Sequence, residues 1–69
     1  MRIYFKKDRE DFTKLILTKG YNLNTLSMEI GKHRSYLNGA LKQGSLGAEP
    51  AMNIAKTLEI DYEELFEIK

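Results

Sequence analysis

Three polar side chains in the middle of the chain could form specific hydrogen bonds with a macromolecular partner. Arg34, Ser35 and Asn38 lie within one short stretch. An arginine can donate two hydrogen bonds to guanine O6 and N7, an asparagine can pair in a similar way with adenine N6 and N7, and a serine can bond either kind of base edge. These residue types at this spacing predict contacts with the base edges of DNA. The alternative is that they form an ordinary solvated polar face.

Four further residues of the same stretch could bind phosphate groups. They are Lys32, His33, Lys42 and Gln43. Phosphate contacts fix the position of a protein on a duplex but carry little information about its sequence. We therefore expect this set to hold the sugar–phosphate backbone, while the first set distinguishes the bases.

Tyr36 lies between the two sets, and its position leaves two roles open. Its ring could pack over the preceding turn, or its hydroxyl and ring could reach a phosphate or a thymine methyl group. We favour packing with one edge in water, and we count Tyr36 among the candidate base contacts.

The side chains needed for catalysis or metal binding are scarce. The chain has no cysteine and a single histidine, and it contains no paired carboxylates or glycine-rich phosphate loop. His33 fits a helix cap or a phosphate contact better than a metal ligand, because no second histidine or cysteine accompanies it. We expect no enzymatic activity, no cofactor, no metal and no small-molecule ligand.

The candidate contact residues can face one partner only if a helix carries them. Leu37, Ala40 and Leu41 recur at helical spacing and would form the inward face of a helix from about residue 34 to residue 42. Gly44 is a suitable end for this helix, because glycine readily adopts the left-handed conformation found after helix C-termini.

A second helix is expected immediately before this one. Asn22 or Asn24 could cap its start, and Gly31 would end it with a sharp turn. Two helices joined in this way can form a helix-turn-helix, which would cover about residues 23–43. Its expected core consists of Leu26, Ser27, Ile30, Gly31, Leu37 and Ala40. The alternative is a plain helical hairpin packed for stability alone.

Three more helices are expected in the remainder of the chain. One spans about residues 9–19, with Asp8 followed by Asp11 as its start signal. Another has Pro50 in its first turn, and a short one follows Asp61, with Glu64 as the partner in a capping pattern. Their expected inward residues are Phe12, Leu15, Ile16, Met52, Ile54, Ala55, Leu58, Leu65 and Phe66.

The first seven residues are harder to place. Ile3 and Phe5 alternate as in a strand, but no convincing partner strand is apparent, so we expect residues 1–7 to form an N-terminal arm against the first helix. The sequence therefore predicts an all-α fold, a compact five-helix domain that covers residues 1–69 with a central helix-turn-helix.

The net charge of +1 conceals a division between the two ends of the chain. Residues 1–46 contain nine Lys or Arg and four Asp or Glu, a balance of +5, whereas residues 47–69 contain two lysines and six acids, a balance of −4. This division favours a basic binding face and an acidic opposite end, although chance clustering is the alternative. No apolar run is long enough to span a membrane, and the absence of cysteine fits a cytoplasmic protein.

Two motifs downstream of the turn complete a family pattern. Residues 54–58 have the sequence Ile-Ala-Lys-Thr-Leu, and residues 63–66 have the sequence Glu-Glu-Leu-Phe. With these motifs in place, residues 23–66 resemble the helix-turn-helix domain of the phage repressor and Cro family, also called the XRE family. The other matching positions are Leu26, Ser27, Gly31, Leu37 and Ala40.

The resemblance implies a lambda-repressor-like, bacterial or phage-encoded transcriptional regulator that binds double-stranded DNA as a homodimer on a near-palindromic operator. It also implies that Arg34 and Ser35 occupy the first base-contacting positions, and that Asn38 and Gly39 occupy the later ones. Gly39 departs from the family pattern, because many relatives place a base-contacting side chain there.

A protein-binding adaptor on the same scaffold, such as an antitoxin-like or anti-activator module, is the alternative function. The modest net charge favours it slightly, because strong DNA binders are usually more basic. For a dimer, residues 66–68 or 3–5 offer apolar side chains near the chain ends.

Overall fold

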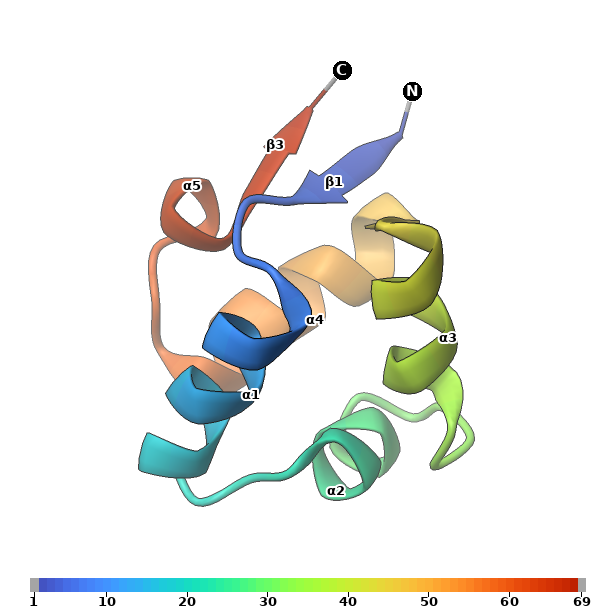
Figure 1. The fold of residues 1–69 in the computed structure, drawn as a ribbon, viewed down its shortest axis with the longest axis vertical. Helices are drawn as coiled ribbons and strands as arrows, with labels where there is room; N and C mark the ends of the chain where they lie inside the picture. Colours follow the sequence, from blue (N-terminus) through green and yellow to red (C-terminus); the bar gives the residue numbers. More distant parts are fainter. Residues whose placement is uncertain (1, 69) are drawn as a thin grey trace.

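Five helices and three short strands make up residues 2–68, the part of the chain that the computed structural model describes. The order is β1 (Ile3–Phe5), α1 (Arg9–Thr18), α2 (Leu23–Glu29), α3 (Tyr36–Gln43), β2 (Ser45–Leu46), α4 (Ala48–Leu58), α5 (Tyr62–Leu65) and β3 (Phe66–Ile68). Strands β1 and β3 lie side by side at one end of the molecule, close to both chain termini, and α2 lies at the opposite end (Figure 1).

The three short strands form one antiparallel sheet, so the prediction of an all-α fold is wrong. The strand order is β2-β1-β3, and Ile3 of the central strand is in register with Leu46 on one side and Ile68 on the other. Each strand has only two or three residues. The paired strands are connected through helices rather than by a tight hairpin turn. The sequence therefore contains no turn motif that would predict the strand pairing.

The segment that we expected to form an arm contains the central strand of this sheet. Ile3 is 1% exposed, and the ring of Phe5 lies 5.3 Å from that of Phe12 and 5.4 Å from that of Phe66, measured between centroids. Phe66 was expected in the last helix, but it begins β3 and is buried. Ile3 and Phe66 therefore serve the core of the monomer, not a dimer interface.

The first two helices begin and end at the signals that the sequence offers. The Asp8 side chain accepts a hydrogen bond from the Asp11 amide, and Asn22 and Thr25 form a reciprocal capping box at the start of α2. Gly31 has a φ of 80°, a left-handed conformation that lets the chain reverse direction directly after α2.

The later helices differ in detail from the expectation. Helix α3 begins at Tyr36 rather than Arg34, and the Asp61 side chain makes no capping bond to α5. In α4 the buried side is formed by Ala51, Ile54, Ala55 and Leu58, while Met52 is 44% exposed. No helix among residues 2–68 is long and apolar enough to cross a lipid bilayer.

A buried serine joins α2 to α3. Ser27 is 0% exposed, and its hydroxyl donates to the Leu23 carbonyl at 2.7 Å while it accepts the Leu37 amide at 3.0 Å. Leu37 is the second residue of α3, so its N–H has no acceptor within its own helix. The Ser35 side chain, at the N-cap position, makes no capping bond. Ser27 therefore caps α3 from the neighbouring helix.

Replacement of Ser27 by alanine should lower the free energy of unfolding by about 1–3 kcal/mol, because it leaves the buried Leu37 amide without an acceptor. Urea denaturation of the full chain measures this change. Thr18→Ala is the control, since the Thr18 hydroxyl also donates to a carbonyl of its own helix but is exposed, and it should change stability by less than about 0.5 kcal/mol. Equal effects of the two substitutions would contradict the capping role of Ser27.

A second prediction concerns two isoleucines that are in register on neighbouring strands but differ in burial. Ile3 is 1% exposed and Ile68 is 57% exposed. Ile3→Ala should lower the free energy of unfolding by about 2–5 kcal/mol through a core cavity, and Ile68→Ala by about 0.5 kcal/mol or less. The same urea titration compares them. A small effect of Ile3→Ala would mean that residues 3–5 are a loose arm after all.

Candidate nucleic-acid interface

Helix α3 has one buried face and one exposed face. Leu37 and Ala40 are buried against the core, and Leu41 is half-buried. Successive residues of an α-helix are rotated by about 100°, which puts Lys42 and Gly39 on the opposite side. Both are exposed. The helix therefore presents a narrow outward face with one cation and one position that lacks a side chain.

Arg34 and Ser35 lie in the turn before α3, not in the helix itself. Both are exposed. The Ser35 amide and hydroxyl both lie within hydrogen-bond distance of His33 Nδ1, at 3.2 Å and 2.9 Å. Because a backbone N–H can only donate, Nδ1 is an acceptor, and a neutral His33 ring carries its proton on Nε2. His33 thus stabilises the turn that presents Arg34, and its Nε2–H is left for other contacts.

Asn38 is tied to a residue outside the helix-turn-helix. Its Oδ1 accepts a hydrogen bond from Arg9 Nη2, at the first residue of α1. The bond fixes the orientation of the half-buried amide and places a guanidinium beside α3. Asn38 also borders a shallow hollow of about 290 Å³, together with Thr13 of α1 and residues 22–24 at the start of α2.

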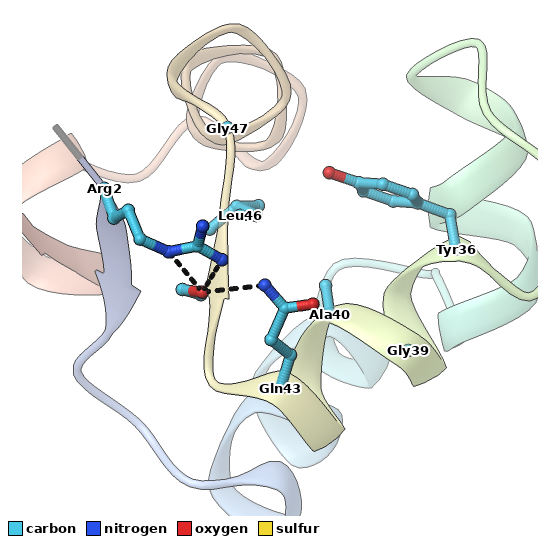
Figure 2. Close-up of a pocket in the computed structure, with 8 residues that line it drawn as sticks. Arg2, Tyr36, Gly39, Ala40, Gln43, Leu46 and Gly47 are labelled. Carbon is cyan, nitrogen blue, oxygen red and sulfur yellow. Dashed lines mark hydrogen bonds between the residues drawn. The ribbon is translucent and has the colours of Figure 1, made fainter.

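On its other side, α3 borders a larger hollow of about 440 Å³. Figure 2 shows that Arg2 and Gln43 meet on one side of it, where both donate to the Ser45 hydroxyl. The Arg2 Nη2 and Nε atoms lie 2.7 Å and 3.2 Å from Ser45 Oγ, and Gln43 Nε2 lies 3.2 Å away. The remaining lining residues are Tyr36, Gly39, Ala40, Leu46 and Gly47.

Tyr36 packs beside this hollow with its hydroxyl directed toward the start of α4 (Figure 2). Burial raises the pKa of its phenol, and an interaction with the Gly47 backbone amide lowers the pKa and offsets part of that rise. The phenol is therefore neutral and a hydrogen-bond donor at physiological pH. The Lys32 ammonium lies 5.5 Å from the centre of the ring, within the range of a cation–π contact.

Gly39 has no structural reason to be a glycine within the described part of the chain. It is not among the glycines with a positive φ, and a Cβ atom built on it meets nothing within 4 Å. Glycine in a helix interior costs about 0.5–1 kcal/mol relative to alanine. Neither the backbone conformation nor the packing of the described residues therefore requires a glycine at position 39.

Among residues 2–68, no carboxylate pairs with the cations around α3. An ion pair joins Lys14 to Glu10 on α1. Arg2, Arg9 and Lys42 bond to neutral groups or point to solvent. No acidic residue lines either hollow beside α3, whereas a third hollow, beside α5 and β3, includes Glu63 and Glu67. The two hollows beside α3 are therefore lined by neutral residues and one arginine, Arg2.

Sequence reasoning missed two residues of this surface, Arg2 and Arg9. Their partners Ser45 and Asn38 lie 43 and 29 residues away along the chain. No local pattern links residues at such separations. The other candidate base and phosphate residues all lie on α3 or in the turn that leads to it, but Gln43 faces the Arg2 hollow rather than the outward face.

No family model, curated protein or solved structure matches the chain. The likeness to the phage repressor and Cro family therefore stays a prediction. Residues 2–68 also contain no group of three or more His, Cys, Asp or Glu side chains arranged to hold a metal ion.

The open space at Gly39 predicts that Gly39→Ala raises the free energy of unfolding by about 0.5–1 kcal/mol, because alanine is the better helix former and nothing obstructs its methyl group. Gly44→Ala is the contrasting variant. Its φ of 88° is left-handed, so alanine should cost about 1–2 kcal/mol there. Thermal or urea unfolding of both variants measures the difference. A loss of stability in Gly39→Ala would show that the glycine serves the fold.

Proposed function

We propose that the protein is a sequence-specific, double-stranded DNA-binding transcriptional regulator of the phage repressor and Cro type, which inserts α3 into the major groove. The observation that carries the proposal is the outward face of α3. It is polar and basic, it lacks carboxylate partners within the described residues, and it has a bare backbone at Gly39.

The dimensions of α3 suit this role. Its eight residues extend about 12 Å, and the major groove of B-DNA is about 12 Å wide. A glycine in the middle of the outward face lets the helix axis come closer to the base edges than a long side chain would allow. Gly39 then contributes by close approach, while the residues around it supply the hydrogen bonds.

Base contacts are assigned to the residues at the start of α3. Arg34 projects from the turn and can bond guanine, and Ser35 stands beside it. Asn38 is held by Arg9, so its amide is oriented before DNA arrives. Tyr36 lies half-buried at the edge of the face, where its ring can meet a thymine methyl group.

Phosphate contacts are assigned to residues around the rim of this face. Lys32, His33 and Lys42 are exposed and have donors free to bind phosphate oxygens. Gln43 gives one N–H to Ser45 and keeps another for the same purpose.

A symmetric dimer would match a near-palindromic site with half-sites about 10 base pairs apart. Selection of bound duplexes from a random pool by the full chain tests both parts of this proposal. An enriched palindrome supports base recognition by a dimer, and an enriched single half-site supports base recognition by a monomer. No enrichment would reject sequence-specific DNA binding and favour the protein-binding adaptor.

On the selected duplex, Arg34→Ala should weaken binding by about 1–3 kcal/mol and relax the preference at one base pair. Lys42→Ala should weaken binding to all sequences alike and make the affinity less dependent on salt. Lys56→Ala removes the same charge from the last turn of α4 and serves as the control. Fluorescence anisotropy on the selected and single-mismatch duplexes measures all three. Unchanged affinity for both α3 variants would reject the assigned face.

A further inference from the structure

We infer that Arg2 and Arg9, which lie outside the helix-turn-helix, bind phosphate groups of the two opposite DNA strands on either side of α3. The inference rests on the proposed function and extends it, because it names two cations that fix how α3 sits between the strands. It depends on the two hydrogen bonds that tie these arginines to the opposite flanks of the helix.

The two arginines approach α3 from different sides. Arg9 bonds Asn38, and Arg2 shares the Ser45 hydroxyl with Gln43. Asn38 and Gln43 are five residues apart, so they lie about 140° apart around the helix axis. The outward face lies between them. A helix in the major groove has one sugar–phosphate backbone on each side. The flanks marked by Asn38 and Gln43 therefore meet different strands.

The Arg2 flank has the chemistry of a phosphate contact. Its hollow of about 440 Å³ is lined on one side by Arg2 and Gln43 and on the other by Tyr36, with the bare backbone of Gly39 at its edge. A guanidinium has five N–H donors, and Arg2 uses only two of them on Ser45. The rest can bond a phosphate oxygen.

The Arg9 flank of α3 also offers unused guanidinium donors, in this case from α1. Arg9 gives one N–H to Asn38 and keeps its other donors. Of the acids near it in sequence, Asp8 caps α1, Glu10 pairs with Lys14, and Asp11 lies in the first turn of α1. The adjoining hollow is lined by uncharged polar side chains and Leu23, with no acid to repel a phosphate.

The existing hydrogen bonds also make both arginines efficient ligands. A free arginine side chain loses considerable conformational entropy when it is fixed at an interface. Ser45 and Asn38 already hold these two side chains beside α3, and Ser45 is itself buried. Part of the ordering is therefore complete before DNA binds.

The first experiment measures how the dissociation constant depends on salt for the full chain and the duplex selected from the random pool. Each lost phosphate contact lowers the slope of log K against log salt by about 0.9. We expect this decrease for Arg2→Gln and for Arg9→Gln, and about twice the decrease for the double variant. Lys56→Gln, at the end of α4 far from α3 (Figure 1), should leave the slope unchanged.

The second experiment assigns each arginine to a strand. Methylphosphonate groups replace single phosphates, one position at a time, in either strand of the selected duplex, which removes one charge at each site. A neutral linkage opposite Arg2 should weaken the wild type but leave Arg2→Gln unaffected, and the linkage that does the same for Arg9→Gln should lie in the other strand. Linkages in the same strand would overturn the inference, as would unchanged salt slopes in both variants.

Two controls separate the inference from the fold and from the proposed function. Arg2→Lys and Arg9→Lys keep the charge and should retain the wild-type slope, so a lysine variant that folds but loses the slope would also count against the assignment. If the wild type selects no duplex and shows no salt-dependent binding, the proposed function fails and the inference falls with it. If the wild type binds and the arginine variants match it, the inference alone fails.

Discussion

The position of α3 depends on one buried hydroxyl. Ser27 bonds its own helix through the Leu23 carbonyl and caps α3 through the Leu37 amide. Buried polar groups are costly without partners, and this arrangement satisfies both groups at once. It also fixes where α3 starts relative to α2. The crossing at Ser27 therefore fixes the N-terminal end of α3, where the Ser35 side chain makes no capping bond.

The small sheet holds the C-terminal end of α3 in place. β2 follows α3 after a single left-handed glycine, Gly44, and pairs with β1. β1 also pairs with β3, so the first and last described segments of the chain are joined beside the end of α3 (Figure 1). A three-residue strand is unstable in isolation, and here Ile3 and Phe66 anchor the sheet in the shared core. The sheet is thereby what brings Arg2 to the flank of α3.

Arg2 from the first part of the chain and two acids from the last part border different hollows in the structure. The cations of the first two thirds of the chain include those around α3, where no carboxylate pairs with them among the described residues. The acids of the last third include Glu63 and Glu67, which border a separate hollow beside α5 and β3. The two hollows beside α3 thus contain no acid, whereas the hollow beside α5 and β3 combines two acids with Lys6.

The sequence alone determined the features that depend on neighbours along the chain. Caps at Asp8 and Asn22, the turn at Gly31 and the apolar spacing of α3 all act within a few residues, so they could be recognised by eye. Only the tertiary structure decided what depends on distant partners. The strand pairing of Ile3, the burial of Ala51 instead of Met52, and the placement of the two flanking arginines follow from contacts between elements remote in sequence. Local sequence patterns cannot predict such contacts. In an isolated segment several helix faces or strand partners are equally favourable, and only tertiary packing selects one of them.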